Sequence, residues 1–219
     1  MTVSHNDLSI RMNSLRLNHG QVAKVMEDTR LASGMVPSAR DAMIRKLRRS
    51  DVPFAKGEIH KESPNDEVFY EFVHLAELGL AMRLLGEGLR FGHAVQLVSR
   101  HRSVLRCFYR EALLEANSGR GAPIPLTMLD PIRVDPKTGE PTYPEAAGLY
   151  LDFVANQQNG ILLLSEPELL GPKAAISRFM SLEDGFRLLP LVALSQLCSR
   201  IEKIASATPP VKRGPKPRN

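Results

Sequence analysis

The segment FVHLAELGLAMRLL, residues 72–85, carries the most regular helical pattern in the chain. Its apolar residues recur at the spacing of one helix face, whereas Glu77 and Arg83 lie off that face. The segment is therefore predicted to form an amphipathic helix, whose apolar side holds Leu75, Leu78, Met82 and Leu85. A chain of 219 residues is long enough to bury a core.

Signals for helix starts and stops divide the residues on either side of this segment. A short helix is predicted over 21–31, and a second begins at Pro37 and ends before Pro53, because proline suits a first turn and breaks a helix interior. Residues 54–72, with a turn cluster between short apolar runs, predict a β-hairpin. Two glycines follow the helix over 72–85, and a longer helix is then predicted from about residue 91 to residue 117.

The second half of the chain has a different composition. Residues 118–148 are rich in glycine and proline, which indicates a boundary near 118–125. Strands or buried segments are predicted at 149–154 and 160–164, and helices at 172–179 and 191–205. The two cysteines, Cys107 and Cys198, lie in apolar helical contexts and are expected to be reduced and buried.

Two short helices, a hairpin and two further helices make the layout of a winged helix-turn-helix. The segments QVAKVMEDTRLASGMVPSARDAMIRKLRRSDVPF and FVHLAELGLAMRLLGEGLRFGHAVQLV resemble the DNA-binding domain of the mercury-resistance-regulator (MerR) type, over residues 21–110. The turn Gly88-Leu89-Arg90 is similar to the family's turn between helices. The chain departs from the family after Arg45, where Lys46 and Leu47 replace an aromatic pair.

The resemblance implies a fold and an order of domains. The predicted fold is mainly α with a small β component: an N-terminal winged helix-turn-helix with a long helix, followed by a small α+β C-terminal domain. We predict four segments: a flexible arm over 1–20, the DNA-binding domain over 21–117, a sensing or assembly domain over 118–207 and a basic, disordered tail over 208–219.

Positive charge is concentrated in the second predicted helix. The formal net charge of the chain is +5, and residues 38–56 hold six basic and two acidic side chains. Helical spacing predicts a cationic face with Arg45, Arg48 and Arg49, and an opposite apolar face with Ala42, Met43 and Leu47. Such a helix can pack inward and still present guanidinium groups to phosphates or guanine edges in the major groove. A solvated charged face without a ligand is the alternative.

The candidate DNA contacts come from this helix, from the wing and from the tail. Lys56 and Lys61 lie in the predicted wing, and the tail segment KRGPKPR resembles an AT-hook in which Pro215 replaces the second arginine. The predicted DNA-binding residues are Arg40, Arg45, Lys46, Arg48, Arg49, Lys56, Lys61, Lys212, Arg213 and Lys216. Further basic residues at 100, 102, 106 and 110 are expected to contact phosphate, line a dimer partner or be solvated.

Sequence motifs for catalysis and metal binding are absent. The chain has no phosphate-binding glycine loop, no nucleophile elbow and no HExxH motif, and its histidines and cysteines have no zinc spacing. We therefore expect no enzymatic activity, no cofactor and no metal. The N-terminus lacks the apolar stretch of a secretory signal, and a cytoplasmic protein is expected.

The sequence predicts a transcriptional regulator that binds specific sites in double-stranded DNA, as a homodimer. A small-molecule effector has no support in the residues. One alternative is an architectural or excisionase-like accessory factor that uses the same winged fold to bend DNA. An alternative of another class is a non-catalytic interaction adaptor, which would hold another protein on the apolar surfaces of residues 72–85 and 105–114.

Overall fold

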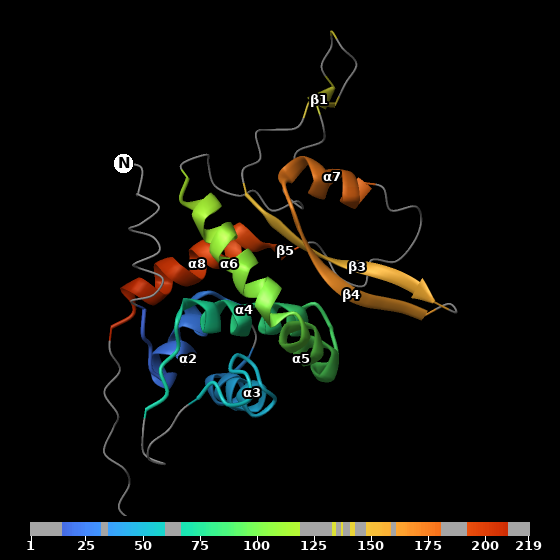
Figure 1. Cartoon of the computed structure of the whole chain (residues 1–219). Helices are drawn as coiled ribbons and strands as arrows, with labels where there is room; N and C mark the ends of the chain where they lie inside the picture. The colour runs from blue at the N-terminus through green and yellow to red at the C-terminus, as the bar shows by residue number, and fades with distance from the viewer. Residues whose placement is uncertain are drawn as a thin grey trace, which may run out of the picture.

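The computed structural model describes residues 15–31, 35–59, 67–118, 133–134, 137, 141–142, 148–158, 161–180 and 192–209 (Figure 1). The helices are α2 (His19–Asp28), α3 (Pro37–Arg49), α4 (Phe72–Gly86), α5 (Phe91–Arg100), α6 (Arg102–Ala116), α7 (Pro172–Met180) and α8 (Leu194–Ala207). The strands are β1 (Arg133–Val134), β2 (Pro141–Thr142), β3 (Tyr150–Gln158), β4 (Ile161–Leu170) and β5 (Val192–Ala193). The prediction of a mainly helical fold with a small β component is confirmed.

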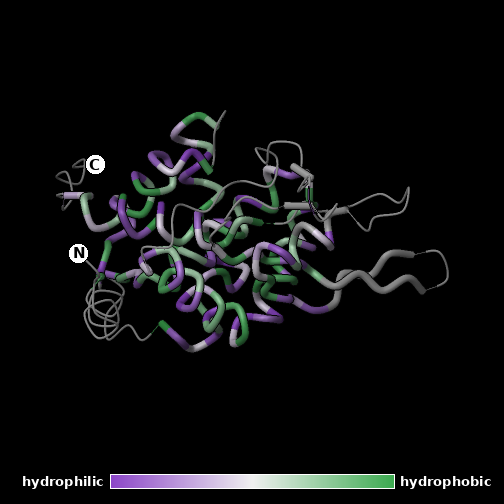
Figure 2. Tube along the Cα trace, turned by 90° about the horizontal axis from the view of Figure 1, so that it is seen from above, coloured by the Kyte–Doolittle hydropathy of each residue, from purple (hydrophilic) through white to green (hydrophobic). Residues whose placement is uncertain are grey.

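Local signals explain where the first two helices begin. Asn18 caps α2 in a capping box: its side-chain oxygen accepts from the backbone N–H of Gln21 at 3.0 Å, and the Gln21 side chain accepts from the Asn18 N–H at 3.0 Å. Pro37 occupies the first turn of α3, where a missing N–H costs nothing. Seen from above, hydrophobic and hydrophilic stretches alternate along the chain, as expected when helices bury one face (Figure 2).

Helix α4 is the centre of the hydrophobic core. Every residue from Phe72 to Leu84 except Arg83 is buried. The helix packs against α5, α6 and α8, and in Figure 1 it crosses the middle of the helical body. The prediction of a one-sided amphipathic helix is therefore wrong, because neighbours cover α4 on both its apolar face and most of the opposite face, where even Glu77 has no exposed surface.

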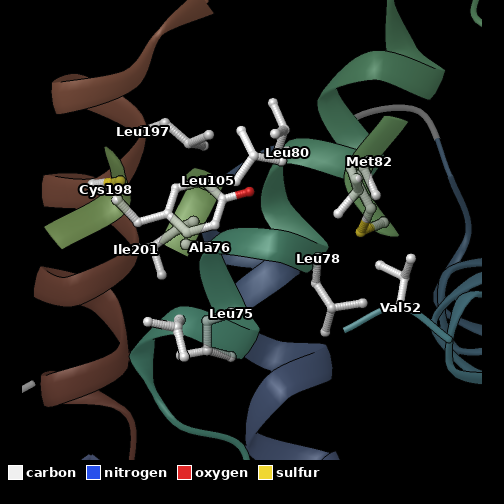
Figure 3. Packing of buried hydrophobic residues seen from close by; sticks show 14 of the residues in the cluster. Val52, Leu75, Ala76, Leu78, Leu80, Met82, Leu105, Leu197, Cys198 and Ile201 are labelled. Carbon is white, nitrogen blue, oxygen red and sulfur yellow. The ribbon is translucent and has the colours of Figure 1, made fainter. Parts of the chain in front are cut away.

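Helix α8 completes this core from the far end of the chain. Its apolar side chains Leu197, Cys198 and Ile201 face the residues of α4 (Figure 3). The two helices approach closely at Gly79, where a Cβ atom would lie 2.6 Å from Ile201 Cδ1 and 3.2 Å from Leu31 Cδ1. A helix from the stretch assigned to the C-terminal domain thus packs into the same core as α2, α4 and α6.

The long helix predicted over 91–117 is two helices. The backbone leaves the helical conformation at His101, with φ −102° and ψ 14°, and this residue ends α5 and begins α6. Each of the two helices buries its own apolar stripe: Leu97 and Val98 from α5, and Leu105 and Tyr109 from α6. Cys198 is buried as predicted, whereas Cys107 on α6 is exposed.

The three-stranded sheet has the order β4-β3-β5, and β1 and β2 form a separate antiparallel pair. Strands β3 and β4 form an antiparallel hairpin, both longer than predicted, with a register shift between Val154 and Ala155. The centre of the predicted wing, residues 60–66, lies outside the described residues. In the described residues on either side of this centre, Tyr70 pairs with Leu17 through backbone hydrogen bonds of 2.8 and 3.0 Å. It does not pair with another described residue of the predicted wing.

The close contact at Gly79 gives a test of the packing. Replacing Gly79 with Leu forces side-chain atoms between α4 and α8 and is expected to lower the free energy of unfolding by about 1–3 kcal/mol. Gly86→Leu is the matched control, because a Cβ at Gly86 meets no atom within 4 Å. Urea denaturation of the two variants measures the difference. Equal stability of both variants would show that α8 does not pack tightly on α4.

Candidate nucleic-acid interface

Helix α3 has one buried and one exposed face. At 3.6 residues per turn its inner side is formed by Arg40, Ile44 and Leu47, all of them buried. The opposite side is exposed, and we call its residues the α3 ridge: Ser38, Ala42, Arg45, Lys46 and Arg49. Small side chains occupy its N-terminal half and three cations its C-terminal half. The small side chains allow another molecule to approach the helix closely, and the cations place positive charge beside that point of approach.

The three cations of the α3 ridge have different surroundings. Arg45 is 59% exposed and pairs with Asp41 one turn before it, at 2.7 Å between Nη2 and Oδ2. Lys46 lies toward α5, with Nζ 4.1 Å from the centroid of the Phe91 ring. Arg49 is exposed and pairs with no carboxylate among the described residues. All three therefore present positive charge at the surface.

Arg40 does not belong to this surface, so its prediction as a DNA contact is wrong. The side chain is buried, pairs with Glu27 of α2 at 3.3 Å and donates from Nη2 to the carbonyl of Met35 at 3.3 Å. The reason is its phase on the helix, since residue 40 shares the inner face with Ile44 and Leu47. Conversely Ala42, predicted on the apolar face, is exposed.

The other predicted contacts are dispersed. Arg48 is half-buried at the edge of α3 and lies near Tyr70, where burial raises the pKa of the Tyr70 hydroxyl and the positive charge of Arg48 opposes the rise. Lys56 is exposed in the loop after α3. Lys61, Lys212, Arg213 and Lys216 lie outside the described residues.

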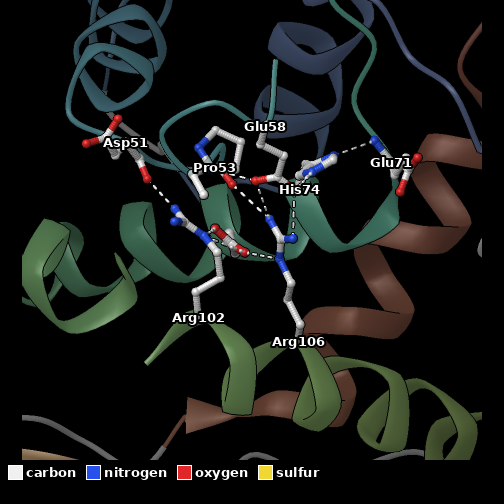
Figure 4. Close-up of polar contacts among 9 residues, drawn as sticks. Asp51, Pro53, Glu58, Glu71, His74, Arg102 and Arg106 are labelled. Carbon is white, nitrogen blue, oxygen red and sulfur yellow. Dashed lines mark hydrogen bonds and ion pairs between the residues drawn. The ribbon is translucent and has the colours of Figure 1, made fainter. Parts of the chain in front are cut away.

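Arg102 and Arg106 of α6, for which the sequence allows several roles, have a structural role. Arg102 and Arg106 both bind Glu77, with distances of 3.0 and 2.6 Å from Nε to the carboxylate (Figure 4). Arg106 also pairs with Glu58 at 2.7 Å. By contrast, the neighbouring Arg100 and Arg110 are exposed.

The same guanidinium groups fasten the loop that leaves α3. Arg102 donates to the carbonyl of Asp51, and Arg106 donates to the carbonyl of Pro53 at 3.2 Å. In Figure 4 both side chains rise from α6 toward this loop. The ion network, defined as Glu58, His74, Glu77, Arg102 and Arg106, therefore links α4 and α6 to the end of α3.

His74 joins the network in its neutral form. Its Nδ1 accepts the backbone N–H of Glu71 at 3.0 Å, so Nε2 carries the proton and donates to Glu58 at 3.2 Å. Burial lowers the pKa of His74, against the attraction of Glu58. Burial alone would raise the pKa of Glu58, but hydrogen bonds from Arg106, the Ala55 N–H and His74 lower it to about 2.

Comparison with protein-family models, with curated proteins and with solved structures found no match to this chain. Across the described part, the His, Cys, Asp and Glu side chains form no group of three or more that is arranged to hold a metal ion. None of the described helices combines the length and apolarity needed to cross a membrane. The α3 ridge is the candidate site because it gathers exposed cations on one face of a helix, and the ion network holds the loop that follows this helix.

The buried carboxylate of Glu77 gives the second test. Glu77→Ala leaves two guanidinium groups without their buried partner and is expected to destabilise the fold by about 3–5 kcal/mol. Glu87→Ala removes a surface pair with Arg83 and is expected to cost less than about 1 kcal/mol. Chemical denaturation measures both, and a loss for Glu77→Ala as small as that of the control would contradict the structural role.

The depressed pKa of Glu58 predicts how stability depends on pH. The carboxyl titrates at 4.5 in the unfolded chain and at about 2 in the fold, so its contribution is present above pH 4.5 and is lost as pH falls toward 2. Glu58→Gln lacks this titration. We expect the stability gap between wild type and Glu58→Gln, measured by thermal melts, to shrink across this acid range. A gap that stays constant from pH 7 to acid pH would contradict the pairing.

Proposed function

We propose that this chain binds double-stranded DNA with α3 as the recognition helix. The observation that carries the proposal is the α3 ridge, which places exposed cations and small side chains on one face of a helix whose other face is buried. The major groove is about as wide as a helix, and small residues allow that helix to approach the bases closely. Arginine and lysine beside them can reach phosphates and guanine edges.

The helix before α3 supports this assignment. α2 contacts α3, and the side chain of His19 at its start reaches Asp41 at 2.6 Å. Two adjoining helices with an exposed, cationic second helix match the arrangement in which the first helix crosses the DNA backbone and the second enters the groove. The resemblance to MerR-type regulators agrees with this order, and we propose transcriptional regulation as the role, with bending of DNA by an accessory factor as the alternative.

The adaptor alternative finds less support in the helical core. The apolar surfaces on which it depends are largely covered: Leu75 and Leu78 of α4 and Leu105 and Leu113 of α6 are fully buried. These side chains serve the fold of the chain itself. Homodimer formation and a sensing or assembly role for the C-terminal region stay predictions.

The basic tail is a further predicted contact. The described chain ends beside α2, because Gln21 Nε2 donates to the carbonyl of Thr208 at 3.3 Å. The basic residues predicted to bind DNA, Lys212, Arg213 and Lys216, follow within a few positions. We propose that the sequence-independent attraction of these basic residues to phosphates adds to that of α3.

Salt dependence of binding tests the proposal. Each phosphate contact contributes about 0.9 to the slope of log K against log salt. The double variant Lys46→Ala/Arg49→Ala is therefore expected to bind a random duplex more weakly and to reduce the slope by about 1.8. Fluorescence anisotropy at several salt concentrations measures both quantities.

The matched control is Arg110→Ala/Arg200→Ala, which removes two exposed cations from α6 and α8. In Figure 1 α8 and the C-terminal half of α6 lie above α4, whereas α3 lies below it. The control is expected to retain the wild-type slope. Equal effects of the two double variants would indicate attraction to the whole basic surface and would overturn the assignment of α3.

A further inference from the structure

The carboxylate of Asp41 is held from two helices. Its Oδ1 lies 2.6 Å from Nε2 of His19, at the start of α2, and its Oδ2 lies 2.7 Å from Nη2 of Arg45 on the α3 ridge. The three side chains are 29–59% exposed, so this cluster lies at the surface. Asp41 is therefore a fixed acceptor at the edge of the proposed DNA-binding face.

The ion pair of Lys24 and Asp28 on α2 is a comparison for the pair of Asp41 and Arg45 on α3. Lys24 and Asp28 of α2 are also four residues apart, with 2.9 Å between Nζ and Oδ1 and similar exposure. Among the described residues, Asp28 pairs only within its own helix. An exposed pair of this kind is worth little, because two mobile side chains lose entropy when they pair. His19 restrains Asp41 from another helix and so reduces that cost for Arg45.

The position of Arg45 on the α3 ridge leaves its restrained guanidinium group accessible to a DNA base. Arg45 lies near the middle of the α3 ridge, between Ala42 and Arg49, where a side chain points away from the core. Its guanidinium has five N–H donors in a rigid fork, and Asp41 occupies only one edge of it. The remaining donors are still able to form the paired hydrogen bonds that arginine makes with O6 and N7 of guanine.

The charge of Asp41 also argues for base contact. A carboxylate at this edge repels phosphates and weakens any surface that only attracts the DNA backbone. The same carboxylate directs the guanidinium of Arg45 to one orientation, as a paired contact with a single base edge requires. Lys46 and Arg49 have no such restraint from a carboxylate among the described residues, and they suit phosphates.

We propose that Asp41 is a positioning residue that fixes Arg45 to read guanine in the major groove, while Lys46 and Arg49 bind phosphates. The partner is then a duplex with a G·C pair at a defined position. This inference rests on the proposed function, since it names the base that the same helix recognises. Arg45 acts on the DNA, and Asp41 acts through Arg45.

Selection from a pool of random duplexes by the full chain tests the inference. Wild type is expected to enrich a motif with guanine at one or more positions. A good paired contact discriminates by roughly 5- to 150-fold. Asp41→Asn is expected to lose most of this preference at one G·C position and to keep the slope of log K against log salt. Arg45→Lys keeps the charge but lacks the planar fork, and it is expected to lose the same position.

Asp28→Asn is the matched control, because it neutralises the acidic member of the comparable pair on α2. It is expected to select the wild-type motif. If Asp41→Asn also keeps the full preference for guanine, or gains affinity equally for every sequence, Asp41 does not position Arg45 and the inference is overturned.

The outcome separates this inference from the proposed function. If wild type binds no duplex in a salt-dependent manner, DNA binding itself fails. If wild type enriches a motif that Arg45→Lys leaves unchanged, DNA binding stands and only the reading of guanine by Arg45 fails. A circular dichroism spectrum for each variant confirms that it is folded before selection begins.

Discussion

The rest of the structure depends on the pairing of one buried carboxylate with two arginines. Glu77 lies in a central helix with no exposed surface, and an unpaired charge there would cost far more than a hydrogen bond returns. Burial raises the pKa of Glu77, and Arg106 and Arg102 oppose this by stabilising the charged form. The need to satisfy this group fixes α6 against α4. It also determines where the loop after α3 can lie, because the same arginines bind that loop.

This arrangement connects the core to the surface of α3. The inner face of α3 is anchored by Ile44 and Leu47, by the pair of Arg40 with Glu27 and, at its C-terminal end, by the loop that Arg106 holds. A helix fixed in this way from behind keeps a constant outer face. Geometry of this kind is what base recognition requires, because hydrogen bonds to base edges tolerate little displacement of the side chains that make them.

The sequence was informative where the signals are local. The proline at position 37 and the glycines at the C-terminal end of α4 are short-range features, and they locate the start of α3 and the end of α4 closely. Pairing between side chains that are far apart along the chain cannot be identified from local sequence signals. Nothing near Glu77 in the sequence indicates that Arg102 and Arg106 bind it, since these partners come from another helix. For the same reason α8 was assigned to a separate domain, although its apolar face closes the core around α4.

The candidate site was predicted in part. Basic residues at helical spacing identified α3, and Arg45, Lys46 and Arg49 are exposed as expected. Arg40 was misplaced because a charged residue was assumed to face solvent, whereas its carboxylate partner lies on α2. The role of Asp41 depends on His19, which is remote in sequence and adjacent only in the fold.

Titration of the labelled protein with a random duplex, followed by NMR of the backbone amides, tests the central claim most directly. If α3 enters the groove, the largest shifts fall along Ser38, Ala42, Arg45 and Arg49, and the amides of α8 around Cys198 stay unchanged. Shifts concentrated on α6 and α8, or no shifts at all, would contradict DNA binding by α3.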